Sequence, residues 1–181
     1  TLPILHYVLE HSAHTEDTQR ELEALILTPT RELALQVCTH IRAVVDAAGR
    51  FANVATVCGG MSVQKQERML QQHGGAHVIV ATPGRLWDLL KQDDALALRV
   101  RRTRFLVIDE ADRMIETGHF AEMDSILSMV RRTKGAVADA NSAMQTFVYS
   151  ATMTKTLQAN LKRAPWRKKQ RTAASSNNNC L

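Results

Sequence analysis

The segment Asp109-Glu110-Ala111-Asp112 places three carboxylates directly after the apolar run Phe105–Ile108. Such a run followed by polar residues predicts a buried strand whose carboxyl end presents acids to solvent. A carboxylate there can hold a hydrated magnesium ion against the phosphates of a nucleotide, and its neighbour can orient an attacking water molecule. We assign the metal to Asp109 and the water to Glu110. The simpler alternative is that these acids stabilise a helix start through its dipole.

Two hydroxyl residues, Ser150 and Thr152, follow a β-type run at residues 146–149. If that strand lies beside the strand ending at Ile108, the hydroxyls reach the level of Asp112 and can donate hydrogen bonds to its carboxylate. Capping of a following helix is the alternative for this short segment.

Three further segments combine a β-type run with a helix start. Free backbone N–H groups and the dipole make such a start favourable for phosphate, and Arg31 and Arg85 add cations in the first turn. Glycine allows a phosphate backbone to approach closely, and Ser62 is the candidate cap after the glycine pair. The residues of these three candidate anion sites are Pro29, Thr30, Arg31, Gly59, Gly60, Thr82, Pro83, Gly84 and Arg85. Each segment alone is more typical of an ordinary helix start, and the anion-site interpretation depends on the three occurring together.

The elements that must position these residues alternate along the chain. Helical patterns, including an expected helix at residues 2–9, separate the β-type runs. The runs are at residues 24–27, 52–58, 77–81, 105–108 and 146–149. Alternation of this kind predicts an α/β fold with parallel strands, right-handed helical crossovers and ligands beyond the carboxyl ends of the strands.

Length and charge predict one folded domain at residues 1–161 and a basic, polar, flexible tail at residues 162–181. Six of the 23 Lys and Arg residues lie in the tail, which has no acid, so the net charge of +5 arises there. No apolar run approaches the roughly 18 residues of a membrane-spanning helix. Three cysteines without paired spacing favour a reducing compartment. We therefore expect a soluble, intracellular protein without a membrane partner.

A second basic cluster precedes the fourth β-type run. We interpret it as a solvated loop, with an RNA contact as the alternative. Its residues are Arg99, Arg101, Arg102 and Arg104.

Taken in order, these motifs resemble the first RecA-like domain of DEAD-box RNA helicases over residues 1–160. Segments 82–90 and 108–123 are also similar to a nucleolar subgroup linked to large ribosomal subunit assembly. The resemblance implies a RecA-like (P-loop NTPase type) parallel sheet sandwiched by helices, with ATP and Mg2+ as cofactors. It implies RNA as partner, single-stranded or in short duplexes, bound through its backbone without sequence specificity. Nuclear and nucleolar localisation follows, with the cytoplasm as alternative.

The resemblance also implies roles for the site residues. Asp109 helps to hold magnesium through water, and Glu110 positions the hydrolytic water. Asp112, with Ser150 and Thr152, couples the ATP state to the grip on RNA. The nine residues of the candidate anion sites hold the RNA backbone.

The sequence departs from the family pattern at both ends. The phosphate-binding Gly-Lys-Thr loop is expected just before Thr1, and the second RecA-like domain with its arginine finger is expected after the first. We therefore expect a fragment of a helicase, incomplete at its N-terminus and deficient in ATP hydrolysis by itself. Its expected partners are the second domain and pre-ribosomal proteins. Alternatives are a non-catalytic RNA-binding or assembly module and, less well supported, a metal-dependent nuclease.

Overall fold

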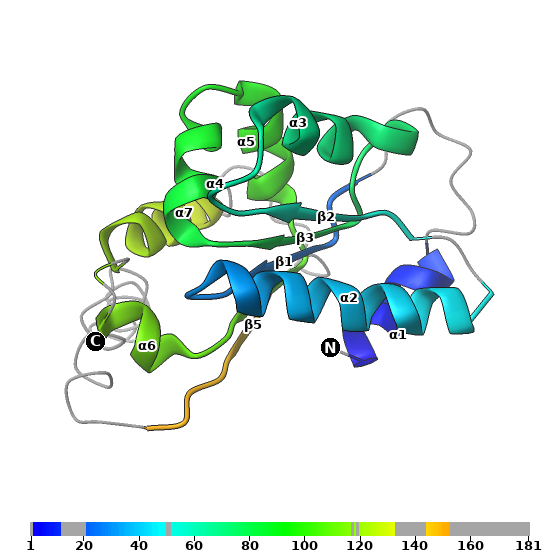
Figure 1. Cartoon of the computed structure of the whole chain (residues 1–181), viewed down its shortest axis with the longest axis horizontal. Helices are drawn as coiled ribbons and strands as arrows, with labels where there is room; N and C mark the ends of the chain where they lie inside the picture. The colour runs from blue at the N-terminus through cyan, green and yellow to red at the C-terminus, as the bar shows by residue number, and fades with distance from the viewer. Residues whose placement is uncertain are drawn as a thin grey trace, which may run out of the picture.

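In a computed structural model, the protein consists of a parallel β-sheet with helices on both faces (Figure 1). The structure describes residues 2–11, 21–49, 52–116, 118, 120–132 and 144–152. The predicted tail at residues 162–181 and the domain boundary at 161 lie outside these ranges. Within them, no helix is both long and apolar enough to span a bilayer.

The sheet contains five parallel strands in the order β2-β3-β1-β4-β5, which confirms the predicted fold class. The strands are β1 (Ala24–Leu27), β2 (Val54–Val57), β3 (Val78–Ala81), β4 (Phe105–Ile108) and β5 (Gln145–Val148). The predicted β2 was too long, because the carbonyl of Cys58 leaves the sheet and accepts a hydrogen bond from the Gln66 side chain.

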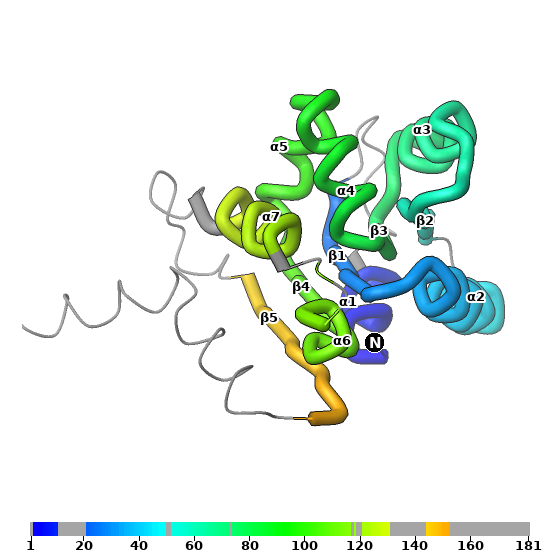
Figure 2. The backbone as a smooth tube through the Cα atoms, turned by 60° about the vertical axis from the view of Figure 1, so that its left-hand side comes forward, coloured from blue at the N-terminus to red at the C-terminus, as the bar shows by residue number. Residues whose placement is uncertain are grey.

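The helices divide between the two faces of the sheet (Figures 1 and 2). They are α1 (Leu2–His11), α2 (Arg31–Ala47), α3 (Val63–Gln71), α4 (Pro83–Leu90), α5 (Asp94–Arg102), α6 (Ala111–Glu116) and α7 (Phe120–Arg132), with a short 3-10 turn, η2 (Gln72–Gly74). From β1 the chain passes beyond the position of β3 to form β2 at one edge of the sheet. It then returns through β3, crosses β1 to form β4, and forms β5 on the other edge. Right-handed crossovers therefore place α2, with α1, on one face and α3, α4, α5 and α7 on the other.

Alternation along each strand fills two hydrophobic layers. In β1, Ala24 and Ile26 pack toward α1 and α2, whereas Leu25 and Leu27 pack toward the opposite helices. Strands β1 to β4 are buried along their whole length, as expected for parallel strands covered on both faces. The outermost strand, β5, is exposed at its first two residues and half-buried at the next two.

The interpretation of the second basic cluster as a loop is wrong, because three of its arginines lie in the last turn of α5. Leu96, Ala97 and Val100 on the buried face give this segment a helical period, and Asp93 caps its start by accepting from the N–H of Leu96 at 2.9 Å. The half-buried Arg99 donates to the carbonyl of Ala76 at 2.8 Å. The helix therefore helps to hold the amino end of β3.

Candidate functional site

All five strands end in one row, so the segments that follow them share one edge of the sheet. Leu27 is in register with both Ala81 and Ile108. Val57 is in register with Ala81, and Val148 with Ile108. Each predicted site segment begins within two residues of one of these strand ends, so the sheet brings the predicted site residues to its carboxyl edge.

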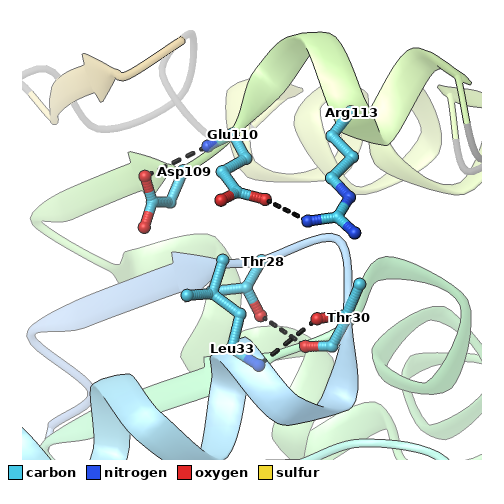
Figure 3. Close-up of polar contacts among 6 residues, drawn as sticks. All are labelled: Thr28, Thr30, Leu33, Asp109, Glu110 and Arg113. Atoms are coloured by element: carbon cyan, nitrogen blue, oxygen red, sulfur yellow. Dashed lines mark hydrogen bonds and ion pairs between the residues drawn. The ribbon is translucent and has the colours of Figure 1, made fainter. Parts of the chain in front are cut away.

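The two carboxylates Asp109 and Glu110 lie at the end of β4, opposite the loop that follows β1 (Figure 3). The Oδ1 atom of Asp109 accepts from the N–H of Glu110 at 3.0 Å. Glu110 has a φ of 47°, a left-handed conformation that is uncommon for a non-glycine residue and is often found at functional sites. Its Oε2 atom lies 3.3 Å from the Nη1 atom of Arg113. Both carboxylates are half-exposed and can therefore be reached by a ligand.

The arrangement at β4 suits a magnesium ion that keeps most of its ligands from outside the protein. In the described part of the chain, no three His, Cys, Asp or Glu side chains lie close enough to hold a metal. Mg2+ commonly binds through one or two carboxylates and completes its shell with water and substrate phosphate. Asp109, which is half-exposed at the end of β4, fits that pattern.

Asp112 on α6 joins the ends of β4 and β5, which confirms the predicted contact with Thr152. One carboxylate oxygen, Oδ2, accepts from the backbone N–H of Thr152 at 2.9 Å and from its Oγ1 at 2.6 Å. The Thr152 hydroxyl is the largest cause of a pKa of about 2 for Asp112. Ser150 lowers this pKa least among the causes, and its own hydroxyl donates to the Thr152 carbonyl at 2.9 Å.

The predicted helix starts are present, with one difference. Thr30 caps α2, and its Oγ1 accepts from the N–H of Leu33 at 3.3 Å (Figure 3). Thr28 supports this turn by donating to the carbonyl of Thr30 at 3.3 Å. Thr82 is the N-cap of α4 and Pro83 is its first residue, but the Thr82 hydroxyl makes no capping hydrogen bond. The first turn of α4 therefore lacks the side-chain cap that covers the first turn of α2.

Arg31 and Gly60 bring two of the candidate anion sites into contact. Gly60 has a φ of 74°, and a Cβ atom on it would overlap the Arg31 guanidinium group. By contrast, nothing lies within 4 Å of a Cβ placed on Gly59. Glycine is therefore favoured at residue 60 by its backbone conformation, and any Cβ there would also displace the end of the Arg31 side chain.

Gln66 was missed by sequence reasoning, although it connects the glycine-pair site to the candidate anion site at Arg85. Its side chain is 0% exposed. The Nε2 atom donates to the carbonyls of Cys58 at 3.1 Å and Met61 at 3.0 Å, and Oε1 accepts from Nε of Arg85 at 3.2 Å. The available signal was its spacing, one turn before Leu70 on the buried face of α3.

Known proteins resemble this chain in both sequence and structure. The family model described as DEAD/DEAH box helicase matches residues 1–159. The ATP-dependent RNA helicase DDX24 of Mus musculus is 49% identical over 141 residues, covering 78% of this chain and 15% of the mouse protein. The ATP-dependent RNA helicase mak5 of Neosartorya fischeri is 38% identical over 181 residues, covering 88% of this chain and 23% of that protein.

One solved structure carries the same similarity into three dimensions. The RNA helicase Prp28 from Chaetomium thermophilum, crystallised with ADP, matches with a TM-score of 0.63 and 34% identity. The match covers 89% of this chain and 34% of that one. The chain thus spans only a small part of the length of the proteins it resembles.

Proposed function

Because the chain belongs to the DEAD/DEAH box helicase family, we propose that it contributes the RNA-backbone site and part of the ATP site to an ATP-dependent RNA helicase. The fold is the RecA-like α/β fold of such helicases. The observation that carries the proposal is the common row of strand ends, which gathers every motif at one edge of the sheet.

RNA is held at the ends of β1, β2 and β3. Arg31 and Arg85 provide cations, the first turn of α4 provides backbone donors, and Gly59-Gly60 allows the RNA backbone to come close. Contacts to phosphate and sugar fix position without reading sequence. The substrate class is therefore single-stranded RNA or a short duplex without sequence preference.

The nucleotide side lies at the ends of β4 and β5. Asp109 holds magnesium through water, and the bound ion neutralises charge on the phosphates. Glu110 orients the attacking water, and Asp112 with Ser150 and Thr152 links the ends of β4 and β5. The 181 residues contain no Gly-Lys-Thr segment, so the isolated chain is expected to lack ATPase activity. RNA-stimulated phosphate release that is abolished by Glu110→Gln would contradict this expectation.

The whole protein is proposed to separate short duplexes or remodel ribonucleoprotein during ribosome biogenesis. Segments 82–90 and 108–123 support this role through their similarity to the nucleolar subgroup. A second RecA-like domain and pre-ribosomal proteins are the proposed partners, and the nucleolus is the proposed location, with the cytoplasm as alternative. Imaging of the tagged full-length protein against a nucleolar marker tests the location.

RNA binding by the 181-residue chain tests the site itself. The probe is a short fluorescein-labelled oligouridine, titrated at several salt concentrations. Replacing Arg31 and Arg85 by Met should lower the slope of log K against log salt by about 1.4, because each lost phosphate contact on a single strand removes about 0.7. Replacing Arg101 and Arg102 together by Met makes the same charge change in the last turn of α5, away from the carboxyl edge, and should leave the slope unchanged.

The same titration separates the second candidate function, an electrostatic adaptor that acts through the basic tail. The tail composition favours this alternative, since residues 162–181 carry six bases and no acid. Binding that survives deletion of the tail supports the folded site. Complete loss of binding assigns RNA recognition to the tail.

A further inference from the structure

Gln66 is a fully buried amide with no direct access to a ligand, yet it lies between two RNA-contacting elements. It belongs to α3, whereas its partners belong to the loop after β2 and to the first turn of α4. Its side chain makes three hydrogen bonds, two as donor and one as acceptor. A buried polar group that makes three hydrogen bonds is costly to replace, because its partners lose their hydrogen bonds as well.

The chemistry of the contact requires an amide. The carbonyls of Cys58 and Met61 need a donor, and Nε of Arg85 needs an acceptor. Only asparagine and glutamine carry a two-hydrogen donor and an acceptor on one planar group. A carboxylate would place negative charge against two carbonyl oxygens, and a methionine of similar size would leave all three partners without a hydrogen bond.

The bond to Gln66 also fixes how Arg85 is presented. Among the residues that the structure describes, the Arg85 guanidinium group makes a hydrogen bond only through Nε. Within those same residues its two terminal nitrogens have no hydrogen-bond partner, so both can donate to a phosphate. A guanidinium group held in this way can offer two parallel N–H groups to one phosphate.

The glycine loop is held from both sides. The Arg31 guanidinium lies against Gly60, and Gln66 holds the carbonyls on either side of the glycine pair. The loop, Arg31 and Arg85 are thereby connected through direct contacts, with Gln66 as the buried member.

We propose that Gln66 is a positioning residue for RNA binding: it sets the Gly59-Gly60 loop and the Arg85 guanidinium in one arrangement that grips the RNA backbone. The inference rests on the proposed RNA-binding function. It adds to that function a neutral, buried residue on which the phosphate contact of Arg85 depends.

The salt dependence of binding by the full 181-residue chain tests this role. With the oligouridine probe, Arg85→Met should lower the slope by about 0.7, the amount for one phosphate contact on a single strand. Gln66→Met should lower it by the same amount although it removes no charge, and the double variant should lower it no further. A purely structural loss of stability does not change the number of phosphate contacts. Gln64→Met, on the exposed side of α3, is the matched control and should behave as wild type.

A measurement without RNA separates failure of the inference from failure of the proposed function. In NMR hydrogen exchange, the Nε–H of Arg85 should be protected in wild type and should exchange rapidly in Gln66→Met. If that variant does not fold, Gln66→Asn keeps the amide on a shorter arm and should give the same two results. A protected Nε–H in a wild-type chain that binds no RNA overturns the proposed function. Normal binding with unchanged slopes in the folded Gln66 variants overturns the inference alone.

Discussion

Two side chains join strand ends at the carboxyl edge of the sheet, and they do so in opposite surroundings. Gln66 joins the end of β2 to the start of α4 from inside the core, at 0% exposure. Asp112 joins the ends of β4 and β5 through Thr152, which is exposed. A contact made by a buried, neutral amide is costly to break, and the amide does not titrate. A partly exposed carboxylate with an exposed partner is less costly to separate and responds to acid. Under the proposed function, the RNA-binding ends of β1 to β3 should therefore stay fixed, whereas the nucleotide-binding ends of β4 and β5 should separate more readily.

The outer strands show the same difference. β2 is buried along its whole length, and the carbonyl of Val54 accepts from Arg42 at 2.8 Å. β5 is exposed or half-buried throughout. Local opening requires less free energy where fewer apolar contacts are lost. Amides of β5 should consequently exchange faster than those of β2.

The largest effect is expected from Gln66→Met. Loss of the amide should lower the free energy of unfolding by about 2–3 kcal/mol, because an unsatisfied buried polar group costs about 1–3 kcal/mol. Urea denaturation of the full chain measures this value. Gln64→Met should stay within about 0.5 kcal/mol of wild type, as is usual for surface substitutions. Equal effects of the two variants would remove the distinction between a buried and an exposed contact.

The next effect is expected at the glycine pair. Gly60→Ala should cost about 1–2 kcal/mol, since a left-handed conformation is unfavourable for alanine and Arg31 must move away from the new methyl group. Gly59→Ala has open space and should change stability by less than about 0.5 kcal/mol. Thermal unfolding of both variants measures the difference. A larger loss of stability for Gly59→Ala than for Gly60→Ala would contradict the assignment of the backbone constraint to Gly60.

A smaller effect distinguishes the helix starts of α2 and α4. Thr30→Ala removes a capping hydrogen bond to Leu33 and should cost about 1 kcal/mol. Thr82→Ala removes no such bond and should cost less in the same unfolding assay. If the first turn of α4 faces the RNA backbone, Thr82→Ala should lower RNA affinity more than Thr30→Ala does.

The features that could be predicted from the sequence are local in origin. The runs Ala24–Leu27 and Phe105–Ile108 are strands because every side chain in them is apolar and buried. Thr30 acts within its own turn. The contact of Thr152 with Asp112 is not local, and it was predicted only on the condition that the two strands are neighbours. Gln66 was missed because it lies within α3 and not in a segment that follows a strand, so nothing in its surroundings pointed to Arg85 on another helix. The conformation of Glu110 was also missed, since nothing in its residue type favours a positive φ.

The smallest effect concerns Asp112 and separates the two contacts by pH. Thr152→Val removes the hydroxyl that most lowers the pKa of Asp112, so this pKa should rise from about 2 toward its ordinary value of 3.8. A lowered folded-state pKa gives stability that is fully present above the unfolded-state value and is lost as the pH falls through the folded-state value. The wild type should therefore lose this contribution between about pH 4 and pH 2, and Thr152→Val should lose less over the same range. NMR titration of the Asp112 carboxyl carbon, with urea midpoints at each pH, measures both quantities. Thr39→Val, which removes an exposed hydroxyl on α2, is the control. An unchanged Asp112 pKa in Thr152→Val would mean that Thr152 does not hold the carboxylate in solution, and the contrast with Gln66 would then rest on burial alone.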